Sequence, residues 1–138
     1  MIVRTQLLGA DPRGKPASLE DLLGLANAIE VEAVARYKQL AQLMEHRGER
    51  DTATAFYDMC EIEKRHVDMV ARRAESFVAR LPAPADCTWR LPPEIAASWS
   101  EVEHSQLLTP YRALAIAVTN EERAFVLYSY IAAAADDP

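Results

Sequence analysis

Apolar residues recur every three or four positions through three long stretches of this chain, residues 18–46, 52–81 and 109–135. That spacing places them on one side of an α-helix, whereas a strand would show alternation at every second position. No stretch with strict alternation and glycine-rich turns competes with this pattern. We therefore expect an all-α fold, an antiparallel bundle built on three long helices within one domain that covers residues 1–138.

The expected ends of these helices follow from capping residues and prolines. Ser18 and Asp21 form a capping box for the first helix, which ends at the "HRGER" segment with Gly48 in the C-terminal turn. The second helix, after Asp51, ends before Pro82, and the third begins with Thr109 as N-cap and Pro110 in its first turn. Residues 1–17 form an N-terminal arm, and residues 82–109 form a proline-rich crossover with a short helix from Pro93.

The composition excludes several classes of protein. A net charge of −6 argues against binding nucleic acid through its phosphates. No stretch reaches the roughly 20 apolar residues of a membrane span, and the first residues lack the pattern of a signal peptide, so we expect a cytoplasmic protein without a membrane partner. Cys60 and Cys87 form no CxxC pair, and we expect both to be buried or half-buried thiols.

The first and third helices share a repeated face. Residues 22–41 and 113–132 align without a gap and share six identities, Leu23/Leu114, Ala26/Ala117, Glu30/Glu121, Ala33/Ala124, Tyr37/Tyr128 and Ala41/Ala132. Their spacing puts all six on one side of a helix, and the two glutamates there occupy positions expected in the core. The off-stripe acidic residues are expected in water: Glu32, Glu61, Glu103 and Glu122.

The second helix has the same kind of interruption. Its inward stripe consists of Phe56, Met59, Glu63, His66, Val70, Ala74 and Phe77. Glu63 and His66 lie one turn apart, so their side chains share a face. Because burying an unpaired carboxylate costs several kcal/mol, carboxylates that converge from three helices beside an imidazole need a positive partner. The pattern predicts a metal site formed by Glu30, Glu63, His66 and Glu121.

Three segments, "AIEVEAVARY", "CEIEKRH" and "TNEERAFVLY", make the chain resemble the ferritin-like superfamily, in particular its rubrerythrin-like branch, over residues 18–135. The resemblance implies a carboxylate-bridged di-iron centre. In that centre Glu30 and His66 are terminal ligands of one iron, Glu63 bridges both irons, and Glu121 binds the second. Another divalent metal is an alternative to iron.

Members of that family have a fourth helix with a second Glu-x-x-His. In this sequence no such helix follows Pro138, which is a departure from the family pattern. Asp136, Asp137 and Pro138 would suit the start of such a helix. The Glu101–His104 pair is either a replacement half-site or an exposed polar turn. We expect a homodimer or larger homo-oligomer, in which a partner chain covers an apolar seam lined by Leu23, Phe56, Leu114 and Ile131.

Two functions stay open at this point. One is an oxygen-active di-iron protein, a ferroxidase or a peroxidase-type oxidoreductase, with the ferroxidase favoured because no CxxC domain supplies electrons. The other is a non-catalytic helical bundle whose main role is homo-oligomeric interaction. Tyr37 and Tyr128 either pack in the core or donate hydrogen bonds to ligands on an antiparallel helix. Met44, Met59 and Met69 are expected to fill the core.

Overall fold

The computed structural model describes residues 19–73, 91 and 94–136 of the chain. All regular secondary structure in these residues is helical, in the order α2 (Leu19–His46), α3 (Arg50–Arg73), α4 (Trp99–Val102) and α5 (Pro110–Asp136). The predicted all-α fold is therefore confirmed, and three of its helices are long, with 28, 24 and 27 residues. Ser18 and the segments 74–90 and 92–93 lie outside the described residues, as does the predicted capping box.

A tight turn joins α2 to α3. The N–H of Gly48 donates to the carbonyl of Glu45 at 3.0 Å, and the N–H of Glu49 donates to the carbonyl of Met44 at 2.8 Å. This pair of bonds is a Schellman motif, and it requires the positive φ of 81° that Gly48 adopts. The sequence places this helix end correctly, while α3 begins at Arg50, slightly earlier than predicted.

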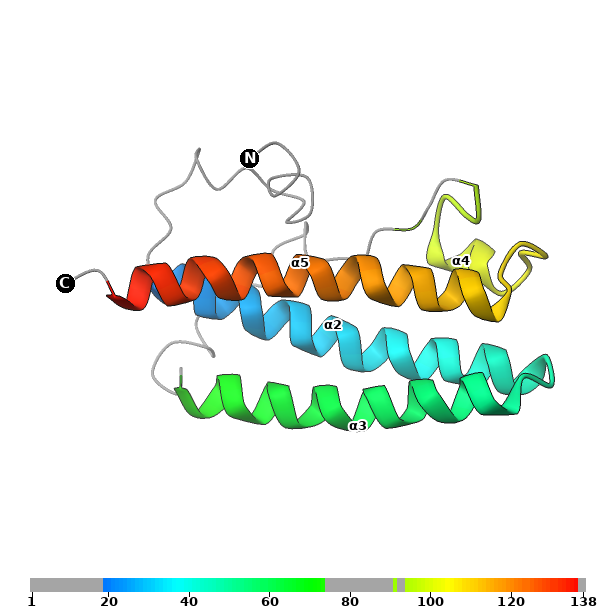
Figure 1. The fold of residues 1–138 in the computed structure, drawn as a ribbon, viewed down its shortest axis with the longest axis horizontal. Helices are drawn as coiled ribbons and strands as arrows, with labels where there is room; N and C mark the ends of the chain where they lie inside the picture. Colours follow the sequence, from blue (N-terminus) through cyan, green and yellow to red (C-terminus); the bar gives the residue numbers. More distant parts are fainter. Residues whose placement is uncertain (1–18, 74–90, 92–93, 137–138) are drawn as a thin grey trace.

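The helices α2 and α3 form an antiparallel hairpin, and α5 also runs antiparallel to α2 (Figure 1). In that view α2 lies between α3 and α5, and it packs against both. Two apolar clusters hold the three helices together. One contains Tyr37, Leu40, Met44, Phe56 and Ile116, and the other contains Leu22, Ile29, Val70, Val126 and Leu127. Along α2 the buried Glu30 falls between them.

Arg47 fastens the end of the crossover to the end of α2. Its guanidinium donates to the carbonyl oxygens of Ser105 at 3.0 Å, Leu108 at 2.9 Å and Glu103 at 3.0 Å. The predicted crossover helix is shorter than expected: of the crossover residues that the structure describes, 91 and 94–109, only Trp99–Val102 form an α-helix, and Pro93 lies outside the described residues. The Thr109 Oγ1 accepts the N–H of Arg112 at 3.3 Å, which confirms the predicted cap of α5.

Some expected core positions are wrong. Met69 is 54% exposed, although Met44 is fully buried and Met59 is half-buried as expected. Of the predicted uncovered seam, Leu23 and Phe56 are instead buried and only Leu114, 40% exposed, faces water. The side chain of Ile131 lies outside the described residues.

Cys60 is buried as expected, and its Sγ donates to the carbonyl of Val34 at 3.4 Å, while Cys87 falls outside the described residues. In the described part of the chain, no helix is long and apolar enough to cross a membrane.

Candidate metal centre

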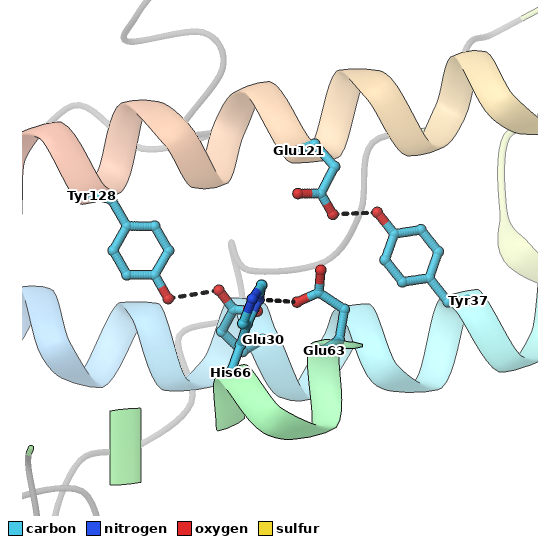
Figure 2. Close-up of polar contacts among 6 residues, drawn as sticks. All are labelled: Glu30, Tyr37, Glu63, His66, Glu121 and Tyr128. Carbon is cyan, nitrogen blue, oxygen red and sulfur yellow. Dashed lines mark hydrogen bonds and ion pairs between the residues drawn. The ribbon is translucent and has the colours of Figure 1, made fainter. Parts of the chain in front are cut away.

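The polar residues predicted on α2 and α3 come together between these helices. Ligand atoms of Glu30, Glu63 and His66 lie within 4.8 Å of one another. Glu30 comes from α2, whereas Glu63 and His66 come from adjacent turns of α3 (Figure 2). Elsewhere among the described residues, no other group of three potential ligands of this kind occurs. Glu63 and His66, the two polar residues of the inward stripe of α3, therefore lie together beside Glu30.

The group is buried on one side and open on the other. Glu30 and Glu63 are 3% and 5% exposed, but the side chain of His66 is 42% exposed. The His66 Nδ1 lies 3.0 Å from Oε2 of Glu63 and 3.5 Å from Oε2 of Glu30. One imidazole thus bridges two carboxylates at the edge of the core.

Glu121 does not occupy the core position expected for it, because its side chain on α5 is exposed. Its carboxylate accepts a hydrogen bond from the hydroxyl of Tyr37 on α2 (Figure 2). Its charge still acts on Glu63, as described below. The structure therefore brings three of the four predicted ligands into one compact group and leaves the fourth beside that group.

Each tyrosine of the repeated face donates a hydrogen bond to the glutamate of the same face on the other helix. The Tyr128 hydroxyl on α5 donates to Oε1 of Glu30 on α2 at 2.6 Å, while Tyr37 on α2 donates to Glu121 on α5. Burial, followed by the hydrogen bond to the facing glutamate, raises the pKa of both phenols. Tyr37 has both roles considered for these tyrosines, because it also packs in the core, and Tyr128 has the hydrogen bond across antiparallel helices.

The electrostatics of the site favour a proton or a cation. Burial, then the hydrogen bond to Glu30 and the charges of Glu30 and Glu121, raise the pKa of Glu63 to about 10. In the described residues, the basic side chain that contacts Glu30 and Glu63 is His66. At neutral pH Glu63 therefore holds a proton, which a metal ion would have to displace.

A cavity of about 320 Å³ lies beside the open edge of the group. It is lined by Leu23, His66, Met69, Val70, Arg73 and Tyr128. Four of these side chains are apolar or aromatic, so the cavity presents a mainly apolar approach to the imidazole. A small, weakly polar molecule could reach His66 through it.

Comparison with solved structures identifies the family. The chain resembles an uncharacterised conserved protein from Magnetospirillum magnetotacticum MS-1, whose crystal structure was solved at 2.00 Å resolution. The two share 35% sequence identity with a TM-score of 0.70, and the match covers 88% of this chain and 78% of the other. The chain belongs to the same ferritin-like family. No protein-family model matches the sequence, and no curated protein matches it.

Several polar residues of this ferritin-like chain lie outside the metal group. The Glu101 carboxylate accepts the N–H of Ala97 at 2.8 Å, and Glu101 and His104 are both exposed, in agreement with a polar turn. Glu61 pairs with Lys64 at 2.8 Å on the surface, as expected for an off-stripe residue. Glu103 and Glu122 are also exposed, and Glu32 is half-buried and paired with Arg36 at 2.6 Å.

The sequence pattern missed one buried polar pair of the ferritin-like core. Asn120 and Arg123 are 4% and 2% exposed, and Nη1 of Arg123 donates to Oδ1 of Asn120 at 2.9 Å. A signal was present, because these residues continue the spacing of Ala113 and Ile116 toward Leu127 on a second face of α5. The six identities of the repeated face lie on a different side of this helix.

Proposed function

We propose that this chain binds a redox-active divalent metal, in the first place iron, through Glu30, Glu63 and His66. The observation that supports this is two buried carboxylates and one imidazole within 4.8 Å, with no lysine or arginine paired to them in the described residues. Bonds of about 2.1 Å hold the ligands of one ion within about 4 Å of each other. A small inward movement of these side chains would therefore complete three bonds.

The donor set fits iron in its chemistry. Carboxylates with an imidazole suit Fe(II) and related first-row ions, while thiolates, which select softer metals, are absent from this group. Glu121 lies beside Glu63 and would supply a ligand to a second ion. Such a centre supplies electron transfer to oxygen or peroxide when it is bound, so we propose iron oxidation or peroxide reduction as the activity.

The protein's own groups would prepare this site in three ways. Glu63 would release its proton when the ion arrives, because its pKa of about 10 keeps it neutral beforehand. Tyr128 and Tyr37 would orient Glu30 and Glu121 through their hydroxyls. The mainly apolar cavity beside His66 would limit water and admit a small oxidant.

Anaerobic titration with ferrous iron tests the proposal, with matched glutamate variants on α3. Glu63→Ala should lose most of the bound iron, whereas Glu61→Ala should bind as the unmodified protein does, because Glu61 is exposed and paired with Lys64. Admission of oxygen to the loaded protein should then produce ferric absorbance in the near-ultraviolet. Equal iron content in the two variants, or no retained iron in the unmodified protein, would refute the assignment.

A second candidate function is a non-catalytic interaction protein that keeps the bundle without its chemistry. The observation that favours it is the set of large apolar side chains exposed on α5, which include Tyr111 and Phe125 at 81% and 74%. Failure of the unmodified protein to bind iron, together with self-association that does not depend on Glu63, would select this candidate over the first.

A further inference from the structure

The cavity beside His66 combines an apolar wall with a basic residue. Leu23, Met69 and Val70 form the wall, and Arg73, in the last turn of α3, carries a permanent positive charge. None of the six described residues that line the cavity is acidic, although Asp and Glu account for 21 of the 138 residues of this chain. The cavity therefore favours an apolar molecule that carries a negative charge.

The side chain of Arg73 is exposed, and it takes part in none of the ion pairs found among the described residues. A guanidinium presents paired N–H donors that match the two oxygens of a carboxylate. Arg72 is exposed as well, but one residue turns a helix by about 100°, and Arg72 does not line the cavity. Of these two neighbouring arginines, only Arg73 lies where it can bind an anion in the cavity.

The residues of the cavity nearest the buried carboxylates are His66 and Tyr128. Nδ1 of His66 lies 3.5 Å from Oε2 of Glu30, and the Tyr128 hydroxyl donates to Oε1 of Glu30 at 2.6 Å (Figure 2). Along α3, His66 is two turns, or about 10.5 Å at 1.5 Å per residue, from Arg73. Because the carboxylate of Glu30 disfavours a second anion close to it, the charged end of an occupant belongs at Arg73.

We propose that this cavity binds the anion of a free medium-chain carboxylic acid, with its carboxylate on Arg73. The hydrocarbon chain lies along Leu23, Met69 and Val70 and ends near His66. The volume of about 320 Å³ is at the lower end of the range of about 300–1,000 Å³ that is usual for ligand sites, which favours a small molecule over a long-chain lipid. The chain also covers Met69, a large apolar side chain that is 54% exposed.

Isothermal titration of the metal-free protein with octanoate tests the binding, with Arg73→Gln and Arg72→Gln as a matched pair. We expect a dissociation constant of about 0.1–1 mM for a ligand of this size. Arg73→Gln should raise it about 10-fold, because a charge-assisted contact is lost, whereas Arg72→Gln should leave it unchanged. No binding at about 10 mM octanoate, or equal effects of the two changes, would overturn the proposal.

Octanol in place of octanoate separates the charge from the chain. It should bind the unmodified protein and Arg73→Gln equally, since it offers no charge to the guanidinium. Met69→Gln should weaken both ligands at least about threefold through lost apolar contact. Ile62→Gln is the control, because Ile62 is also exposed on α3, at 44%, but does not line the cavity. If Arg73→Gln weakened octanol as much as octanoate, the carboxylate would not be bound at Arg73.

Methyl spectra of protein labelled at its methionines locate the ligand. Met69 lines the cavity, whereas Met44 and Met59 belong to the apolar cluster around Phe56. Octanoate should shift the methyl resonance of Met69, which Met69→Leu assigns, and leave those of Met44 and Met59 in place. Shifts at Met44 or Met59 as large as those at Met69 would put the ligand elsewhere and contradict the proposal.

A bound carboxylic acid would also cover the open side of His66, whose side chain is 42% exposed. In the iron-loaded protein, octanoate should then slow the appearance of ferric absorbance after oxygen is admitted, and less so in Arg73→Gln. This consequence rests on the proposed iron binding, whereas the titrations above use metal-free protein, so the two proposals can fail separately. An equal rate with and without saturating octanoate would show that the occupant leaves the approach to His66 open, contrary to the placement proposed for its chain.

Discussion

The repeated face of α2 and its counterpart on α5 have the same six residues but different surroundings. On α2 all six are buried, and Glu30 and Tyr37 are 3% and 0% exposed. On α5 only Ala117 is buried, while Leu114, Glu121, Tyr128 and Ala132 are exposed and Ala124 is half-buried. Identical positions on two helices of one chain therefore have different environments.

The difference arises from how many neighbours each helix has. α2 packs against both α3 and α5, so its repeated face is enclosed (Figure 1). α5 packs through another face, which includes Ile116, Asn120 and Leu127 and is rotated by about 100° from the repeat. The comparison shows that helical spacing identifies a chemical face, but neighbouring helices decide whether that face is buried.

The largest expected contrast is between Leu23→Ala and Leu114→Ala. Leu23 is 9% exposed, so its truncation should cost about 2–4 kcal/mol of unfolding free energy, whereas Leu114 at 40% should cost about 1 kcal/mol or less. Urea unfolding at sub-micromolar protein concentration measures both without a contribution from self-association. Similar losses would show that α5 is as enclosed as α2.

The free energy of unfolding should depend on pH through Glu63, which is buried between α2 and α3. The pKa of Glu63 in the folded protein, about 10, lies above its ordinary value of 4.5, so the folded chain retains a proton that the unfolded chain releases. The resulting stabilisation is complete below about pH 4.5 and is lost as the pH rises toward about 10.

Between pH 6 and 8 the metal-free protein should therefore lose at most about 2.8 kcal/mol from this group, at about 1.4 kcal/mol per pH unit. Chemical denaturation across this pH range measures the loss. Glu63→Gln, which cannot titrate, should flatten the profile, and Glu61→Gln serves as its control. A profile that Glu63→Gln leaves unchanged would contradict this origin.

Removal of a tyrosine hydroxyl should cost more unfolding free energy at Tyr128 than at Tyr37, although Tyr37 is the more buried of the two. Tyr128→Phe takes a donor from Glu30, which is 3% exposed and poorly reached by water, and should cost about 1–3 kcal/mol. Tyr37→Phe should cost less, although Tyr37 is fully buried, because water can solvate the exposed Glu121. Thermal unfolding compares the two, and a larger loss for Tyr37→Phe would reject this explanation.

The smallest effect concerns the start of α5. Thr109→Ala removes the side-chain cap on the N–H of Arg112 and should cost about 1 kcal/mol. Amide hydrogen exchange in the first turn of α5 should increase as well. Thr54→Ala is a control, since the Thr54 hydroxyl donates back to the Arg50 carbonyl within α3 and caps no helix end. Equal effects at both threonines would argue against a cap.

Much of this molecule could be predicted from local sequence rules. Gly48 and the Thr109–Pro110 pair fixed two helix ends, because caps and left-handed turns depend on neighbouring residues alone. The stripe through Phe56, Glu63 and Val70 predicted the buried side of α3. These features require no knowledge of what packs against the helix.

The remaining features depend on contacts between distant segments. The exposure of Glu121 and Met69 and the burial of Asn120 and Arg123 follow from the rotation of α5 and from the absence of a described helix over this side. Hydrophobic periodicity does not determine how a helix is rotated about its own axis when two of its faces could be buried, as is the case for α5. The reciprocal tyrosine bonds likewise depend on the relative axial position of α2 and α5.

The tight turn at Gly48 has a consequence for the order in which the chain folds. Since α2 and α3 are joined by three residues, 47–49, the loop that closes their hairpin is short and costs little chain entropy. α5 follows only after the long segment 74–109, so its docking on α2 requires a larger closure. The hairpin that carries Glu30, Glu63 and His66 should therefore form in the folding transition state before α5 adds Glu121.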